Sequence, residues 1–372
     1  MKCTLKGKSI LNQLSPYQPG KSSDDIKKKY GLQKVVKLAS NENPFGYSPK
    51  LKQSIHTLNV DFETYPDGYT TELRHALSNK LNVGGDQLVF GSGSDEIIQM
   101  IARAFLYPGA HTVMATPTFP QYRHHALIEG AEITEVPLIN GEHDLDQMLD
   151  VINDHTKVVW LCTPNNPTGV SMSKEAFDMF MEKCPQHVLV VLDEAYYEYQ
   201  DVQYDVQAID QLSDHNNLIS LRTFSKAYGL AGLRMGYAIT HENIARQLNI
   251  VRGPFNTSTM AQQAALIALE DQSFIKETVQ TTNAIKQRFQ TFLNKIGWSY
   301  DKSQTNFILV STPVSGEDVF KYLLTHGYIV RPGEALGCPH SIRVTIGTEN
   351  DMENLQQLLQ TFNDQVHKET LQ

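Results

Sequence analysis

The residues with the clearest chemical potential lie in one short segment. Residues 223–234 read TFSKAYGLAGLR, in which Lys226 is surrounded mainly by small and apolar residues. Desolvation disfavours the ammonium form of such a lysine, so its amine can attack an aldehyde and hold it as a Schiff base. Thr223, Ser225 and Arg234 are residue types that bind a phosphate beside that aldehyde. Lysine, aldehyde and phosphate together indicate pyridoxal phosphate as the cofactor; the alternative is an exposed lysine in a glycine-rich turn.

A second candidate is the turn at residues 91–96, which reads GSGSDE. Its glycines let the backbone approach an anion, and the helix expected after it offers unpaired N–H groups at the positive end of its dipole. Ser94, Asp95 and Glu96 are therefore candidate phosphate contacts, unless Ser94 or Asp95 only caps the helix. The turn matches neither the Walker loop nor the GxGxxG fingerprint.

Two further segments carry polar side chains that can hold a cofactor ring. Asp193 and Tyr196 end an apolar strand, and ligands of open α/β sheets bind at such ends. The Asp193 carboxylate can pair with a protonated ring nitrogen or cap a helix, and Tyr196 can hydrogen-bond a phenolic oxygen. Residues 163–169 read TPNNPTG, and turn chemistry explains all of these except Asn166, whose amide can donate to a cofactor oxygen.

The elements that must position these residues alternate along the chain. Residues 87–90 predict a strand and residues 95–106 a helix with one apolar face. Further short, nearly all apolar strands are expected at residues 112–115, 158–161, 188–192 and 218–222. This pattern is typical of a mostly parallel sheet with helices on both faces.

Later in the chain the pattern changes. From about residue 262 long helical stretches surround strands expected at residues 306–310 and 341–346, which indicates a smaller α+β domain. We therefore expect an α/β fold divided into residues 1–40 (N-terminal arm and part of the small domain), 41–262 (large cofactor-binding domain) and 263–372 (small C-terminal domain).

Composition excludes several classes of function. The 372 residues carry a net charge of −9, which argues against general affinity for nucleic acid or an anionic membrane. The chain has no signal-peptide pattern and no run of roughly 18 apolar residues, so we expect a cytoplasmic protein. The four cysteines form no CxxC pair, and His124-His125 has no accompanying ligand motif, so no metal is expected.

Taken in order, these segments resemble the fold-type I pyridoxal-phosphate aminotransferases, and within them the histidinol-phosphate aminotransferase branch. The resemblance covers nearly the whole chain. Its motifs are residues 15–20 (SPYQPG), 41–44 (NENP), 65–68 (YPDG), 93–96 (GSDE), 165–169 (NNPTG), 193–196 (DEAY), 225–226 (SK) and 343–347 (RVTIG).

The resemblance implies a role for each cofactor residue. Lys226 would form the Schiff base and move a proton, Asp193 would pair with the ring nitrogen, and Tyr196 with Asn166 would bind the ring oxygen. Phe119 lies where the family places an aromatic ring over the cofactor. The phosphate would be held by the backbone of Ser94 and Asp95, by the side chains of Thr223, Ser225 and Arg234, and by Tyr65 from the neighbouring subunit. Glu96 is a further expected cofactor-binding residue.

The resemblance also implies the substrate contacts. Arg343 and Arg331 would bind the anionic end of the substrate, although Arg331 can also be a surface charge before a turn. Tyr17 would reach across the dimer to a substrate phosphate, or else pack the arm. Asn43, in the NENP motif, is a further predicted substrate contact.

The implied activity is transfer of an amino group between L-histidinol phosphate plus 2-oxoglutarate and imidazole-acetol phosphate plus L-glutamate, in histidine biosynthesis. A homodimer with shared active sites is expected, with small-molecule substrates and no nucleic acid or membrane partner. An aromatic amino acid aminotransferase and a threonine-phosphate decarboxylase stay open as alternatives. A cofactor-dependent transcription regulator is disfavoured, because this acidic chain carries no segment typical of DNA reading.

Overall fold

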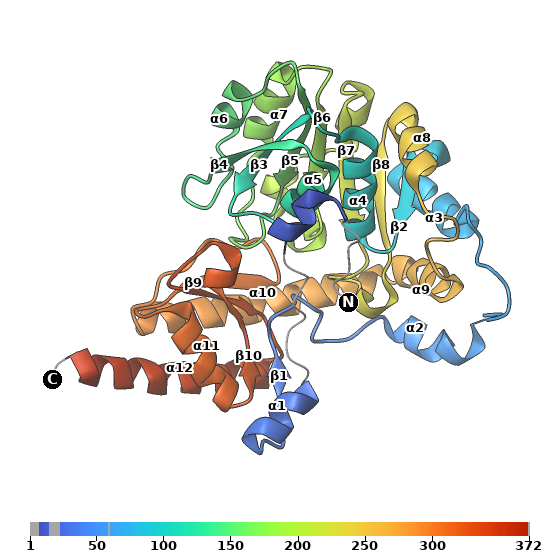
Figure 1. Ribbon diagram of the computed structural model, residues 1–372. Helices are drawn as coiled ribbons and strands as arrows, with labels where there is room; N and C mark the ends of the chain where they lie inside the picture. Colours follow the sequence, from blue (N-terminus) through green and yellow to red (C-terminus); the bar gives the residue numbers. More distant parts are fainter. Residues whose placement is uncertain (1–6, 15–22, 59, 371–372) are drawn as a thin grey trace, which may run out of the picture.

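A seven-stranded sheet forms the centre of the described residues, which in this computed structural model are 7–14, 23–58 and 60–370 (Figure 1). Its spatial order is β2 (Leu88–Gly91), β8 (Gly236–Thr240), β7 (Leu218–Thr223), β6 (Leu189–Asp193), β5 (Thr156–Cys162), β3 (His111–Thr116) and β4 (Glu132–Pro137). Only β8 runs antiparallel to its neighbours; the other pairs within this sheet are parallel. The prediction of an α/β fold with a mostly parallel sheet is confirmed.

The predicted strands are all present, within about two residues of the expected bounds, and β4 and β8 are additional strands of the large sheet. β4 reads EITEVP and exposes several polar side chains, because it lies at the edge of the sheet. Its composition therefore resembles a loop more than a buried strand. β8 begins at a glycine, directly after the segment that carries Arg234.

Helices cover both faces of this sheet. One face packs against α4 (Ser94–Phe105), α5 (Gln121–Glu129) and α8 (Glu242–Val251). The other packs against α2 (Pro49–Ser54), α3 (Thr71–Leu81), α6 (Leu145–Asp150), α7 (Lys174–Lys183) and α9 (Thr259–Glu270). Successive residues of β5 alternate between the faces: Val158 and Trp160 join the first cluster, and Val159 and Leu161 the second. Burial on both faces explains why these strands are nearly all apolar.

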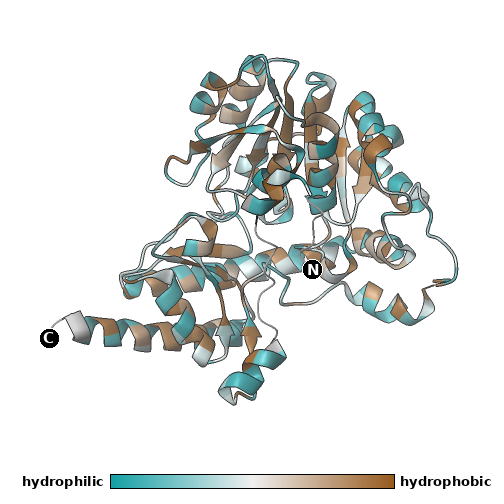
Figure 2. Ribbon diagram, viewed as in Figure 1, coloured by the Kyte–Doolittle hydropathy of each residue, from teal (hydrophilic) through white to brown (hydrophobic). Residues whose placement is uncertain are grey.

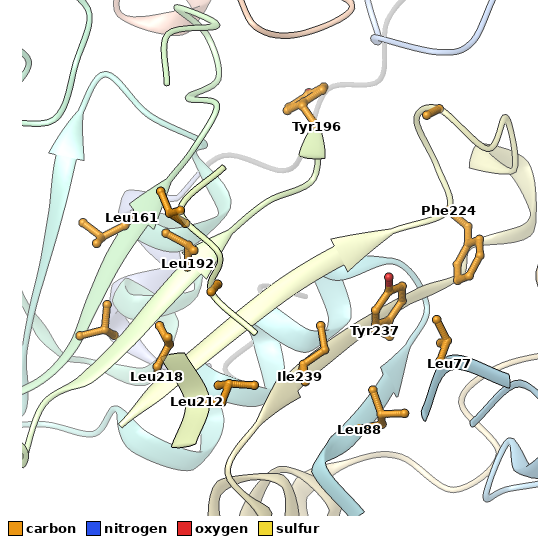
Figure 3. Close-up of a cluster of buried hydrophobic side chains, with 14 of the residues drawn as sticks. Leu77, Leu88, Leu161, Leu192, Tyr196, Leu212, Leu218, Phe224, Tyr237 and Ile239 are labelled. Carbon is orange, nitrogen blue, oxygen red and sulfur yellow. The ribbon is translucent and has the colours of Figure 1, made fainter. Parts of the chain in front are cut away.

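The figures show the same arrangement. In Figure 2 the apolar residues concentrate on the strands and on the helix faces turned toward them. Figure 3 shows part of the second cluster, with Leu88, Leu192, Leu218 and Ile239 from four neighbouring strands of the sheet. Tyr237 on β8 belongs to it as well.

A smaller sheet lies beside the large one. It has the order β11 (Arg331–Pro332), β12 (Ser341–Thr345) and β9 (Phe307–Ser311), and all of its pairs are antiparallel. Near it, β1 (Val36–Lys37) pairs in parallel with β10 (Tyr328–Ile329), so a segment from the start of the chain joins the C-terminal part. The remaining helices of this part are α1 (Ser23–Tyr30), α10 (Gln272–Lys295), α11 (Gly316–Thr325) and α12 (Glu349–Thr370).

The long helix α10 connects the two parts of the molecule (Figure 1). Ile275 near its start packs into a core cluster of the large sheet, whereas Ile285, Phe289 and Leu293 pack beneath the small sheet. The two sheets are therefore held by one continuous element. In the described part of the chain no helix is both long enough and apolar enough to cross a membrane.

Candidate active site

A cavity of about 690 Å³ lies at the edge of the large sheet where its parallel strands end. Its wall combines residues at the ends of β5, β6 and β7 with residues of β1, β10, β11 and β12. The predicted site residues that line it are Ser94, Asp95, Phe119, Asn166, Asp193, Tyr196, Thr223, Ser225, Lys226, Arg234, Arg331 and Arg343. Most of the predicted set is thus brought together, because parallel strands direct their carboxyl ends to one edge of a sheet.

Lys226 follows β7 in a short loop and reaches into this cavity. Its Nζ donates to the carbonyl oxygen of Ser40 at 3.4 Å and lies 5.4 Å from the ring centre of Tyr196. Burial, helped by the positive charge of Arg343, lowers the pKa of Lys226 to about 8. A substantial fraction of the amine is therefore neutral at mildly alkaline pH, as a nucleophile or proton acceptor must be.

Asp193 is the last residue of β6, and only 3% of its surface is exposed. Its Oδ2 accepts a hydrogen bond from the Tyr122 hydroxyl at 2.6 Å, and its Oδ1 accepts one from the Ala195 N–H at 3.1 Å. Burial raises the pKa of Asp193 to about 6. Among the described residues no lysine or arginine forms an ion pair with it. A buried carboxylate without a cation favours a positively charged ligand.

The N-terminus of α4 forms the anion-binding end of the cavity. Its N-cap residue, Gly93, has φ of 77° and no side chain to cap the helix, so the first N–H groups are available to an anion. The Arg234 guanidinium crosses this turn, donates to the Ser92 carbonyl at 3.3 Å and lies 3.6 Å from the Asp95 carboxylate. Another residue at Gly93 would strain the backbone at this positive φ, and its Cβ, 2.5 Å from Arg234 Nη2, would displace the guanidinium.

Two hydroxyls complete this end. Thr223 Oγ1 donates to Ser225 Oγ at 3.0 Å, and both residues line the cavity. Together with the α4 N-terminus and Arg234 they form a concave set of donors, called the anion cradle below. Hydroxyls, N–H groups and a guanidinium are the donors that a phosphate requires.

Three hydrogen bonds orient the polar groups beside Lys226. The Asn41 Nδ2 donates to the Tyr196 hydroxyl at 2.9 Å, so the Tyr196 O–H itself can donate to a ligand. Arg343 Nη1 donates to Asn166 Oδ1 at 2.6 Å, and its Nη2 donates to the Ala39 carbonyl at 2.7 Å. Because its oxygen faces Arg343, the Asn166 NH2 group is directed elsewhere. Arg343 thus links the small sheet to the loop after β5.

Two predicted residues hold the loops instead of lining the cavity. Glu96 Oε2 accepts hydrogen bonds from the Ser92 N–H and from Asn256 Nδ2 at 2.8 Å, and so fixes the turn before α4. Asn43 Nδ2 donates to the carbonyl oxygen of Ala227 at 2.9 Å, next to Lys226 in the sequence. Neither side chain lines the cavity, and their contacts with cofactor and substrate stay predictions.

Of the two predicted dimer residues, Tyr65 is described by the structure and does not line this cavity. Tyr65 is 81% exposed and stacks on Phe255 with ring centres 4.6 Å apart. It does not line the cavity of its own chain, which is compatible with use by a second subunit but does not test that prediction. Tyr17 lies outside the described residues.

Sequence reasoning missed Asn41, Tyr122, Lys37 and Glu42. Asn41 and Glu42 belong to the NENP motif, from which only Asn43 was selected, and Lys37 and Glu42 form an ion pair of 2.8 Å in the cavity wall. The φ of 56° at Asn41 is typical of asparagine, but the sequence alone does not reveal it. Tyr122 had no signal in the sequence, because its hydrogen bond to Asp193 depends on how α5 packs on the sheet.

Pyridoxal phosphate fits these residues. The buried Asp193 carboxylate without a cation suits a protonated ring nitrogen, and the uncapped α4 N-terminus with Arg234 suits its phosphate. Lys226 lies in the same cavity, where it can reach an aldehyde. The fit thus depends on a carboxylate without a cation, an uncapped helix N-terminus and a lysine amine, each of which can bind a group of the cofactor.

Comparisons with known proteins agree with this geometry. Residues 33–361 match the family described as aminotransferase class I and II. Histidinol-phosphate aminotransferase 2 of Oceanobacillus iheyensis is 55% identical over 97% of this chain and its own full length. Histidinol-phosphate aminotransferase of Bacillus subtilis is 51% identical over 95% of this chain and 99% of its own length.

Solved structures agree as well. Histidinol-phosphate aminotransferase from Sinorhizobium meliloti, in complex with pyridoxal-5'-phosphate, has a TM-score of 0.89 and 27% identity, covering 98% of this chain and 99% of that one. A Thermus thermophilus aspartate aminotransferase variant, 20% identical, has a TM-score of 0.82 over 97% of this chain and 100% of its own, and supports the fold alone. This chain belongs to the class I and II aminotransferase family, within the branch of the histidinol-phosphate aminotransferases.

Proposed function

We propose that this chain is a pyridoxal-phosphate-dependent transaminase that converts L-histidinol phosphate and 2-oxoglutarate to imidazole-acetol phosphate and L-glutamate. The relatives support this substrate by name. The single observation that carries the proposal is the combination, in one cavity, of Lys226, the buried carboxylate of Asp193 and the anion cradle. Such a combination serves a phosphorylated aldehyde cofactor with a basic ring nitrogen.

Bound pyridoxal phosphate supplies an aldehyde carbon for the amino group and a ring that accepts electrons from the substrate Cα. Asp193 would hold the proton at the ring nitrogen. Tyr196, which accepts a hydrogen bond from Asn41, would donate its own O–H to the ring oxygen, together with the Asn166 NH2 group. Phe119, in the cavity wall, would stack on the ring face.

Lys226 would move the proton at the substrate Cα. Its lowered pKa of about 8 leaves part of the amine neutral, so it can take that proton and return it to the neighbouring carbon. Its position beside Tyr196 keeps the amine at the cavity wall. The proton is thus held by one residue rather than lost to water.

Arg343 and Arg331 would bind the anionic groups of the substrates. Arg343 is 7% exposed and is already held by Asn166 and Ala39, so little ordering is needed when a carboxylate or phosphate arrives. Arg331 pairs with Arg343 in the register of β11 and β12, which places a second cation in the same wall. Tyr17 and Asn43 remain proposed substrate contacts.

A homodimer with shared active sites is part of the proposal. Tyr65, exposed and stacked on Phe255, would complete the anion cradle of the second subunit.

The proposed domain boundaries lie between residues 40 and 41 and between residues 262 and 263. A cytoplasmic location is supported by Cys162, Cys184 and Cys338, which form no disulfide among the described residues.

Steady-state turnover with competing amino donors tests the substrate. Histidinol phosphate should give the highest kcat/KM among histidinol phosphate, phenylalanine, tyrosine and threonine phosphate, with 2-oxoglutarate as acceptor. A preference for phenylalanine or tyrosine would instead favour an aromatic aminotransferase. Release of carbon dioxide from threonine phosphate would favour the decarboxylase, because that reaction breaks a different bond at Cα.

Mixing two inactive variants tests the shared site. Tyr65→Ala and Lys226→Ala, unfolded and refolded together, should regain activity, because in a heterodimer both substitutions fall in one site and leave the other intact. Tyr65→Ala must first lose most activity alone, and each variant refolded by itself is the control. Heterodimers confirmed by mass without recovered activity would contradict the shared site.

A further inference from the structure

Tyr122 on α5 contacts the candidate catalytic groups from outside the cavity. Its hydroxyl donates to Asp193 Oδ2 at 2.6 Å, and its side chain is fully buried. It does not line the cavity, so it cannot touch the substrate directly. Any influence on the chemistry must therefore pass through Asp193.

Packing fixes the direction of the Tyr122 hydroxyl. The ring stacks on Trp160 with centres 4.9 Å apart and an interplanar angle of 13°, and it meets Phe119 edge to face at 5.6 Å. Trp160 is itself anchored, because its Nε1 donates to Thr112 Oγ1 at 2.9 Å. The phenol is thus held between two rings and aimed at one carboxylate oxygen.

The two protein donors to Asp193 come from different directions. Tyr122 occupies one position on Oδ2, and the Ala195 N–H occupies one on Oδ1. A carboxylate has about four acceptor positions, so the remaining ones can serve a ligand in the cavity. We propose that Tyr122 is a positioning residue, which orients the Asp193 carboxylate and stabilises its anionic form toward the ring nitrogen of the cofactor.

The surroundings of Asp193 oppose its anionic form, and the Tyr122 donor acts against this effect. The titratable groups that face it are Tyr122 from α5, Cys162 from β5, Asp95 from α4, and Glu194 and Tyr196 from its own strand end. Burial and the carboxylates of Asp95 and Glu194 raise the pKa of Asp193, whereas the bond from Tyr122 lowers it. Tyr122 keeps its proton, because burial and the nearby Asp193 charge raise its own pKa well above the usual range.

Tyr122→Phe removes the donor and keeps the stacked ring. We expect affinity for pyridoxal phosphate, measured by fluorescence titration of the cofactor-free protein, to fall about tenfold to a hundredfold, the usual effect of one hydrogen bond to a charged group. With 15N-labelled cofactor, the ring-nitrogen NMR signal should move toward the unprotonated position. A structural role alone would leave that signal unchanged.

Three comparisons sharpen the test. Tyr237→Phe removes another buried tyrosine hydroxyl, near Arg222 and away from the cavity, and should leave affinity and the 15N signal unchanged (Figure 3). Tyr122→His provides an aromatic N–H donor, so it should recover part of the cofactor affinity and part of the 15N signal of the protonated ring nitrogen. In an Asp193→Asn background, Tyr122→Phe should have no further effect on the 15N signal.

Each outcome decides the inference, which rests on the proposed function. Unchanged affinity and 15N signal in folded Tyr122→Phe would overturn it. So would failure of both Tyr122 variants to fold, since Tyr122 would then act on stability and not on Asp193. Failure of the proposed function is seen separately, in wild-type protein that binds pyridoxal phosphate normally but does not transaminate histidinol phosphate.

Discussion

The two ends of the cavity recognise charge in opposite ways. At the anion cradle the side chains of Arg234 and Asp95 are 45% and 51% exposed, and the donors come from two loops that follow strands. At the other end Asp193 is 3% exposed and has no cation among the described residues, only neutral donors. The cradle is open and rich in donors, and the Asp193 carboxylate is buried.

This difference predicts separate roles for the two ends: cofactor binding at the cradle and control of protonation near Asp193. Exposed charges are screened by water, so the cradle depends on the number and geometry of its donors. Near the buried Asp193 a single neutral donor can change the protonation of the carboxylate, because the low dielectric strengthens each hydrogen bond. Substitutions in the cradle should therefore change cofactor affinity and leave turnover at saturating cofactor near normal, whereas substitutions near Asp193 should also change the protonation of the ring nitrogen and the turnover.

Asp193→Asn should produce the largest effect. The amide cannot hold a proton at the ring nitrogen, so kcat should fall roughly 10³-fold, while the cradle still binds the cofactor phosphate. Turnover and cofactor content are measured on the same preparation. Near-normal turnover would mean that Asp193 only caps the loop after β6.

Arg343→Ala should come next. Arg343 is buried and, in the proposed function, binds the anions of both half-reactions, so the activation free energy calculated from kcat/KM should rise by about 2 kcal/mol or more for the amino donor and for 2-oxoglutarate. Arg343→Lys, the matched control, keeps the charge and should recover part of the loss. If only one substrate is affected, the two anions bind at different places.

Arg234→Gln should weaken cofactor binding about tenfold and leave kcat at saturating cofactor close to normal, since its guanidinium is half exposed. The loss should shrink at high salt, which screens the charge in the wild type as well. Arg103→Gln, at the opposite end of α4 and exposed, removes the same charge and should have no effect. A large kcat loss in Arg234→Gln would break the contrast between the two ends.

The test of Lys226 should give the smallest but most specific effect: the pH at which labelling of its amine is half complete. Below a pKa of about 8 the amine is protonated, so its labelling by pyridoxal phosphate and borohydride should rise with pH and level off above that value. Ordinary lysines continue to gain reactivity toward pH of about 10. Peptide mapping at each pH follows the label, and a midpoint near 10 or a label on another lysine would contradict the assignment.

Much of the site was predictable because it is local. Lys226, Thr223, Ser225 and Arg234 share one segment after β7, and Asp193 ends the neighbouring strand β6. A parallel sheet brings such strand ends to one edge, so motifs far apart in sequence converge without further information. The order of apolar strands and polar strand ends therefore determined the fold class and the main residues proposed to bind the cofactor.

Tertiary packing decided what supports these residues. Tyr122 reaches Asp193 across 71 positions, and Asn41 rather than Asn43 reaches Tyr196 across 155. Such contacts depend on how α5 lies on the sheet and how the chain after β1 crosses the cavity, and residue spacing does not encode either. The sequence by itself determined which groups are proposed to do the chemistry, while the packing of distant elements decided which neighbours orient them, because a hydrogen bond requires a distance and direction that only the assembled fold provides.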